Sequence, residues 1–240
     1  MKILVDVHTH TIASGHAYST ITENMQAASR KGIQLVAMTD HTPGIPGSTQ
    51  RYFFDNLRIL PNEMFGTGLL KGAETNIISY EGEIDLPEET LEKLDIVLAS
   101  FHPPCIDFAE EQIVTEGLIK VMENPYVNVI GHPGDKRFPL DFEKVVLASK
   151  RTGTLLEVNN ASLKPGCFRP GVRESLIEML GYCKAHEVPI VLGSDAHYHE
   201  EIGEFKEAIE LLESIDFPEH LVLNTMPDKL LHHIKQKRLK

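Results

Sequence analysis

The sequence predicts an α/β barrel built from seven parallel strands. Short apolar runs alternate with helical segments along the chain, and this order gives parallel strands joined by crossover helices. The runs are rich in valine, isoleucine and leucine, as expected for strands that are covered on both faces. They occupy residues 2–7, 34–39, 69–74, 95–100, 127–131, 154–158 and 189–193.

Helix signals fill the segments between these runs. The first helix is expected over residues 20–31, where Thr20 or Thr22 can cap the N-terminus, Glu23 lies in the first turn and Gly32 ends the helix. Further helices are expected near residues 52–60, 88–94, 109–123, 142–151, 172–186, 200–214 and 228–236.

Two segments are less regular, and neither indicates a second domain. Residues 43–47 form a turn-rich loop of proline and glycine, and residues 221–223 are expected to be a short last strand or an extended segment. The composition does not change along the chain, which contains no repeat and no low-complexity segment. We therefore expect residues 1–240 to form a single barrel domain.

The bulk composition is that of a soluble globular protein, with 42% hydrophobic and 24% charged residues. No apolar run approaches the roughly 20 residues of a membrane helix, and no secretory leader is visible, so we expect a cytoplasmic protein. Cys105, Cys167 and Cys183 form no CxxC pair and are expected to be free thiols. A formal net charge of −12 argues against a nucleic-acid partner, because such a surface needs an excess of basic residues.

Side chains of the kinds that bind metal ions follow six of the seven predicted strands. The C-terminal ends of all strands in a parallel barrel meet at one face, so these residues are expected to converge. Seven imidazoles and two carboxylates gathered there would be costly to desolvate unless they bind metal. An open, doubly wound sheet is the alternative fold, but its switch point gathers residues from only a few strands. The candidate metal ligands are His8, His10, His16, His41, Glu74, His102, His132, Asp195 and His197.

The spacing of these residues supports a shared metal site. His8 and His10 are two positions apart, so on an extended strand both project from one face; Asp195 and His197 repeat this spacing. Glu74 ends an otherwise apolar strand, and a carboxylate can bridge two cations through its two oxygens. Imidazole and carboxylate ligands without cysteine suit Zn²⁺, Mn²⁺ or Fe²⁺.

In order and spacing, these residues resemble the PHP (polymerase and histidinol phosphatase) family over residues 3 to about 200. The motifs that carry the resemblance are His8-Thr9-His10, Thr39-Asp40-His41, Glu74, His102, Gly131-His132-Pro133 and Gly193-Ser194-Asp195-Ala196-His197. Residues 135–139 and 157–160 are most similar to the YcdX-type phosphatases of that family. The resemblance implies a distorted seven-stranded (βα)7 TIM-like barrel that holds three divalent metal ions, usually zinc.

The resemblance also implies how the ligands are shared among the three ions. His16 departs from the general pattern because it lies in a loop rather than at the end of a strand. By position, the three sets are His8, His10, Glu74 and Asp195; Glu74, His102 and His132; and His16, His41 and His197.

The reaction expected from such a site is metal-assisted hydrolysis of a small-molecule phosphomonoester. A hydroxide that bridges the two ions sharing Glu74 would be the nucleophile. Asp195 is expected to position this nucleophile or to pass a proton, and His41 is expected to be essential for turnover. Asp40 and Asp6 are candidates for orienting ligand imidazoles.

Arg137, Lys164 and Arg169 are candidate substrate contacts in the loops after the strands. Other functions remain open at this stage: a histidinol-phosphate phosphatase, a PHP-type phosphodiesterase or 3′–5′ exonuclease, a metal-dependent amidohydrolase or deaminase, and a non-enzymatic metal store. Amidohydrolases often use a bridging lysine, and Lys71, three residues before Glu74, would point to the opposite face of its strand.

Overall fold

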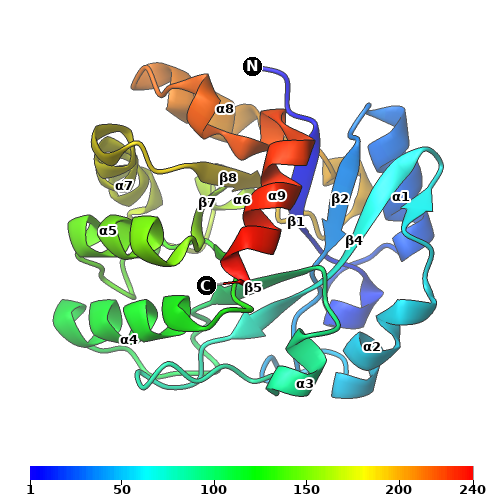
Figure 1. Cartoon of the computed structure of the whole chain (residues 1–240), viewed down its shortest axis with the longest axis horizontal. Helices are drawn as coiled ribbons and strands as arrows, with labels where there is room; N and C mark the ends of the chain where they lie inside the picture. The colour runs from blue at the N-terminus through cyan, green and yellow to red at the C-terminus, as the bar shows by residue number, and fades with distance from the viewer. Residues whose placement is uncertain (240) are drawn as a thin grey trace.

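The computed structural model describes residues 1–239, in which seven parallel strands form a nearly closed barrel surrounded by helices (Figure 1). Each strand pairs with the next along the chain, and each overlaps one of the predicted apolar runs. The predicted fold class is therefore confirmed. The strands are β1 (Val5–Thr9), β2 (Leu35–Met38), β4 (Thr67–Asn76), β5 (Ile96–Ser100), β6 (Val129–Ile130), β7 (Leu155–Asn159) and β8 (Ile190–Gly193).

The helices lie close to their predicted positions. Thr20 caps the first helix in a capping box with Glu23, as its sequence indicates. The α-helices are α1 (Ile21–Arg30), α2 (Arg51–Asn56), α3 (Glu88–Leu91), α4 (Glu111–Glu123), α5 (Phe142–Thr152), α6 (Asn160–Leu163), α7 (Val172–His186), α8 (Lys206–Ser214) and α9 (Pro227–Lys237). The 3₁₀ helices are η1 (Ile12–Ser14), η2 (Leu57–Ile59), η3 (His199–Glu201), η4 (Glu219–Leu221) and η5 (Leu223–Thr225).

Some boundaries differ from the sequence prediction for local reasons. The helix expected from residue 200 is interrupted at Gly203, whose φ of 72° is left-handed, so α8 begins later. A short strand, β3 (Glu63–Met64), was not predicted; it forms a hairpin with β4 through Phe65 and Gly66, both with positive φ. Residues 221–223 form no strand and contribute only an isolated bridge.

Two apolar clusters hold the barrel together. One lies between the strands and the surrounding helices, and the other fills the barrel interior. Leu230 and Ile234 of α9 belong to the interior cluster, together with Val5 and Leu35 near the starts of their strands. Helix α9 therefore closes the N-terminal end of the barrel, where Figure 1 shows it crossing the centre, and leaves the opposite end free for a site. Within residues 1–239, no helix has the length and apolarity to cross a lipid bilayer.

At the N-terminal end of the barrel, β1 and β8 are joined by an asparagine side chain rather than by regular backbone hydrogen bonds between the strands. Asn224 is fully buried, and its amide donates to the carbonyls of Val5 (2.9 Å) and Leu192 (2.7 Å). Its carbonyl oxygen accepts from the N–H of Leu192 (2.7 Å). Because an amide both donates and accepts, Asn224 takes the place of a strand residue in the gap.

Replacing Asn224 by alanine is expected to lower the free energy of unfolding by at least about 3 kcal/mol, because each buried backbone group left without a partner costs about 1–3 kcal/mol. Urea unfolding in the presence of a chelator measures this loss. Asn62→Ala is the control, since Asn62 is exposed and should change stability by less than about 0.5 kcal/mol. A loss below about 1 kcal/mol for Asn224→Ala would contradict this account of barrel closure.

Candidate metal centre

The predicted ligands from separate strands converge on Glu74 at the C-terminal end of the barrel. Glu74 is fully buried, and its Oε2 lies 2.8 Å from Nδ1 of His41 and 3.3 Å from Nε2 of His8. Its other oxygen, Oε1, lies 2.9 Å from Nε2 of His132 and 3.4 Å from Nε2 of His102. The two carboxylate oxygens thus face two different groups of imidazoles, which is the geometry that a bridging ligand requires.

Asp195 brings the end of β8 into the same centre. Its Oδ1 lies 3.1 Å from Nε2 of His10 and 3.6 Å from Nε2 of His8. The backbone of Asp195 is joined to β1, because its N–H donates to the carbonyl of His8 (2.8 Å). Asp195 has a φ of 56° and His132 a φ of 32°, conformations that are uncommon outside glycine and that concentrate at functional sites.

The loop histidine, His16, also reaches the centre, at its exposed rim. Its Nε2 lies 3.0 Å from Nε2 of His197, and its ring stacks on that of His41 with centroids 5.1 Å apart. Among the described residues, three groups have ligand atoms within 4.8 Å of one another: His10, His41 and His197; His8, His10 and Glu74; and His41, Glu74 and His102. His41 therefore lies between Glu74 and the outer histidines rather than with the outer pair alone.

Several buried ligand atoms lack any hydrogen-bond partner. Nδ1 of His8 faces Glu157, so in the neutral form of the ring the proton would lie there and Nε2 would present a lone pair to Glu74 and Asp195. Acceptors facing one another in a buried site are unfavourable unless a cation lies between them. The residues therefore fit divalent metal ions. The atoms without partners include Nε2 of His8, His10 and His102, Nδ1 of His41 and Oε2 of Glu74.

The outward-facing nitrogens of these rings are held by other polar groups. Nδ1 of His102 lies 2.6 Å from Oδ1 of Asn76, and Nδ1 of His10 lies 3.0 Å from the hydroxyl of Ser14. Ser14 in turn donates to Asp40 (2.7 Å), so Asp40 acts on His10 through Ser14 rather than by direct contact. Such contacts fix ring orientation and tautomer at metal sites.

The carboxylate that contacts the ring of His8 is not the one expected from the sequence. Asp6 contacts no imidazole; it accepts from the backbone N–H groups of Ser194 (3.1 Å) and Gly203 (2.9 Å). The partner of the His8 ring is Glu157 on β7, at 2.8 Å. Glu157 was not among the predicted site residues, although it begins the segment 157–160 that resembles YcdX-type phosphatases and, like Glu74, is a single acid in an apolar strand.

The electrostatics of the centre favour an ionised Glu74 and neutral rings at His10 and His102. Burial lowers the pKa of His8, but Glu157, Glu74 and Asp195 raise it well above its usual range. Burial would raise the pKa of Glu74, but His8, His41 and His102 hold it well below its usual range. Burial lowers the pKa of His102 to about 4, and burial followed by His197 and His41 lowers that of His10. At neutral pH the carboxylate is therefore ionised and these two rings are neutral, as metal coordination requires.

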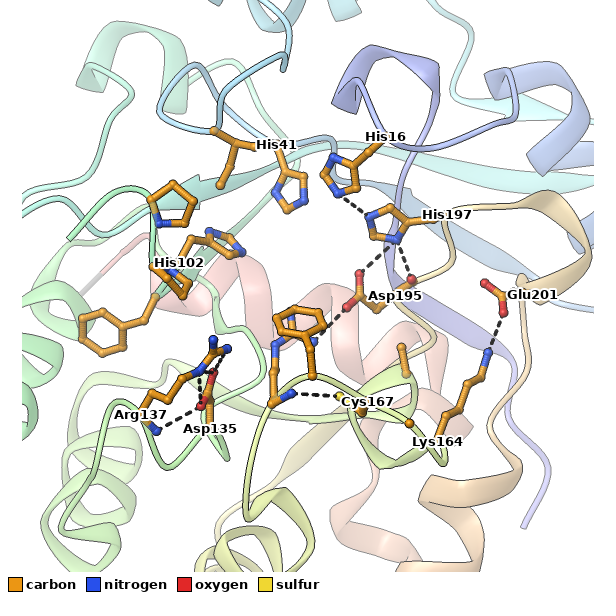
Figure 2. A pocket seen from close by; sticks show the side chains of 18 residues that line it. His16, His41, His102, Asp135, Arg137, Lys164, Cys167, Asp195, His197 and Glu201 are labelled. Atoms are coloured by element: carbon orange, nitrogen blue, oxygen red, sulfur yellow. Dashed lines mark hydrogen bonds and ion pairs between the residues drawn. The ribbon is translucent and has the colours of Figure 1, made fainter. Parts of the chain in front are cut away.

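A cavity of about 660 Å³ opens over the centre and is lined by His16, His41, His102, Asp195 and His197 (Figure 2). Its walls are partly apolar, with contributions from Ile45, Phe101, Pro103, Pro104 and Phe168. The cavity is large enough for a small-molecule substrate.

All three basic residues predicted from the sequence line this cavity, and each has an acidic partner. Nη2 of Arg137 lies 2.6 Å from Asp135, and Nζ of Lys164 lies 2.6 Å from Glu201. Arg169 is nearest to the centre: its Nη1 lies 3.6 Å from Oδ2 of Asp195.

Comparison with known proteins finds no matching family model but many similar sequences. A probable phosphatase from Acetivibrio thermocellus is 48% identical over 99% of this chain and 98% of its own length. A probable phosphatase from Caldanaerobacter subterraneus subsp. tengcongensis is 46% identical over 99% and 93%. A crystal structure of histidinol phosphate phosphatase from Lactococcus lactis, in complex with zinc, L-histidinol and phosphate, shares the fold, with a TM-score of 0.61, 16% identity and coverage of 89% and 94%.

Proposed function

The chain belongs to the family of proteins named probable phosphatases, and from this premise we propose that it hydrolyses small-molecule phosphomonoesters at a centre of three divalent metal ions. The observation that carries the proposal is the position of Glu74, whose two oxygens face two groups of imidazoles, each of which includes a buried nitrogen without a hydrogen-bond partner. The ordered ligand pattern further supports membership of the PHP family and, within it, of the YcdX type.

The proposed ligand sets are those that the resemblance to the PHP family implies, and zinc is the proposed metal, with Mn²⁺ or Fe²⁺ as alternatives. The Lactococcus lactis protein of the same fold binds zinc and phosphate, which supports this choice. When bound, the ions would supply the Lewis acidity that activates water as a hydroxide and offsets charge on the phosphoryl oxygens. The proposed sets are His8, His10, Glu74 and Asp195; Glu74, His102 and His132; and His16, His41 and His197, in which His41 also contacts Glu74.

Asp195 is proposed to orient the attacking water or to pass a proton. Burial would raise its pKa, but His8, His10 and His197 hold the pKa well below its usual range, so the carboxylate stays ionised. Asn159 donates to Oδ2 of Asp195 (3.2 Å), which leaves Oδ1 directed at the histidines. Arg169 is proposed to contact the oxygens of the substrate's phosphate group. Arg137 and Lys164, which also line the cavity, are proposed as further substrate contacts.

Replacing His41 by alanine is expected to lower kcat on phosphomonoesters by at least about 10³-fold, because a catalytic metal supplies several kcal/mol of transition-state stabilisation and 1.36 kcal/mol is a tenfold change in rate. Metal analysis by mass spectrometry should show fewer bound ions per chain, while circular dichroism should be unchanged. His220→Ala is the control, since His220 is an exposed histidine that pairs with Glu187 away from the centre. Substantial activity in a metal-depleted His41→Ala protein would refute the three-metal assignment.

Substrate choice separates the proposed reaction from its rivals. A phosphodiesterase or exonuclease would cleave bis-aryl phosphodiesters or DNA, and an amidohydrolase would act on amides.

Lys71 donates to Asn62 (2.7 Å) and makes no contact with Glu74, so the bridging lysine typical of amidohydrolases has no counterpart there. L-Histidinol phosphate is a second candidate substrate, supported by the shared fold of the Lactococcus lactis protein. A metal store would bind zinc and release no phosphate.

A further inference from the structure

We propose that Glu157 is a positioning residue that fixes the ring of His8 and the backbone of His132 for the metal centre, an inference that rests on the proposed function. Glu157 lies on β7 and is fully buried. Its Oε1 lies 2.8 Å from Nδ1 of His8, and its Oε2 accepts from the N–H of His132 at 2.6 Å. One carboxylate thus connects β1, β7 and the loop after β6.

The chemistry of the contact determines which nitrogen of His8 is available. An ionised carboxylate only accepts hydrogen bonds, so the ring must present its proton at Nδ1. Nε2 is then the ring nitrogen left for a cation, and it lies 3.3 Å from Oε2 of Glu74 and 3.6 Å from Oδ1 of Asp195. Glu157 therefore prepares His8 to bind a cation through Nε2 without itself reaching that cation.

The second contact stabilises an unusual backbone conformation. His132 has a φ of 32°, which costs energy in a residue with a side chain and persists only when its surroundings enforce it. The short hydrogen bond from its N–H to Glu157 provides such a restraint. Asn159 also donates to Oε2 of Glu157 (3.2 Å), so both oxygens of the carboxylate are occupied by donors.

Gly193 makes room for this carboxylate. A Cβ at position 193 would lie 1.9 Å from Oε1 of Glu157 and 2.6 Å from Cβ of His8. Gly193 is in β8, and no left-handed conformation requires glycine there. The close approaches of Glu157 and of His8 together require a glycine at this position, so Gly193→Ala would displace both side chains.

The test compares metal affinity in the wild type and in Glu157→Gln. An amide can accept on one side only, so either His8 or His132 loses its acceptor. We expect the dissociation constant for Zn²⁺, measured by competition with a chromophoric chelator, to rise about 10- to 100-fold. The visible absorption spectrum of the Co²⁺-loaded protein should change as well, because the His8 ring is no longer held.

Glu207→Gln is the matched control. Glu207 accepts from the side chain of Asn160 (3.2 Å) beside the end of β7, and its substitution should leave Zn²⁺ affinity and the Co²⁺ spectrum unchanged. Wild-type affinity and spectrum in Glu157→Gln would overturn the inference, even if the metal-free variant unfolds at a lower temperature. If Glu157→Gln does not fold, Glu157→Asp decides, because its shorter carboxylate withdraws from His8: weaker Zn²⁺ binding supports the inference and unchanged binding overturns it. If the wild type binds no Zn²⁺ at all, the proposed function itself fails.

Discussion

Glu74→Gln is expected to reduce phosphomonoester hydrolysis by at least about 10³-fold and to weaken metal binding most strongly of all single substitutions in the centre, because a bridging ligand serves two ions at once. Oxygens of Glu74 lie within 3.4 Å of ring nitrogens of His8, His41, His102 and His132. The amide keeps the shape of the side chain but loses its charge and one of its two acceptors. Steady-state kinetics together with metal analysis of the purified variant measure both effects.

Glu187→Gln provides the control for this experiment, because Glu187 also contacts an imidazole, at 3.1 Å from Nε2 of His220, but on the exposed surface. It should retain full activity and metal content. Glu74→Gln with activity within tenfold of the wild type, at unchanged metal content, would show that the carboxylate does not bridge catalytic ions.

Metal removal is expected to lower the melting temperature by about 10 °C. Without cations, Glu74 and the ring nitrogens around it form a buried cluster in which several atoms have no partner. A ligand at about 1,000 times its dissociation constant stabilises the folded state by about 4 kcal/mol, and each kcal/mol shifts the melting temperature of a chain of this size by about 2–4 °C. Differential scanning calorimetry before and after chelation, followed by readdition of Zn²⁺, measures the change.

The same scan with Glu74→Gln separates specific binding from general effects of salt. The variant should show a much smaller shift on adding Zn²⁺, because its centre binds metal weakly. Equal melting temperatures for the chelated and the Zn²⁺-loaded wild type would contradict a metal centre formed by these residues.

The sequence predicted the convergence of the site residues wherever one geometric rule, the common direction of parallel strands, applies to many residues. Parallel strands place their C-terminal ends at one face, so the apolar runs alone were enough to bring His8, Glu74, His102 and His132 together. Glu157 lies one position before the end of the run at residues 154–158, so a rule about residues at or beyond strand ends does not select it. Its signal is that of a single acid within an apolar strand.

Other features depend on contacts that leave no local signal. Asn224 joins β1 to β8, although even the nearer of its two partners in sequence, Leu192, is more than thirty residues away. An asparagine after an irregular segment gives no indication of that role. His16 reaches the centre because its loop folds back, which strand periodicity cannot predict. Asp6 lies on the expected strand, but it accepts hydrogen bonds from the backbone N–H groups of Ser194 and Gly203 after β8.

Phosphate release from a panel of phosphomonoesters, by the protein as purified and after treatment with a strong chelator, tests the central claim most directly. The account predicts release that is lost on chelation and restored by Zn²⁺, Mn²⁺ or Fe²⁺, and the ranking of substrates would identify the leaving group that fits the cavity. Release that persists after all metal has been removed, or no release from any phosphomonoester while metal is bound, would contradict it.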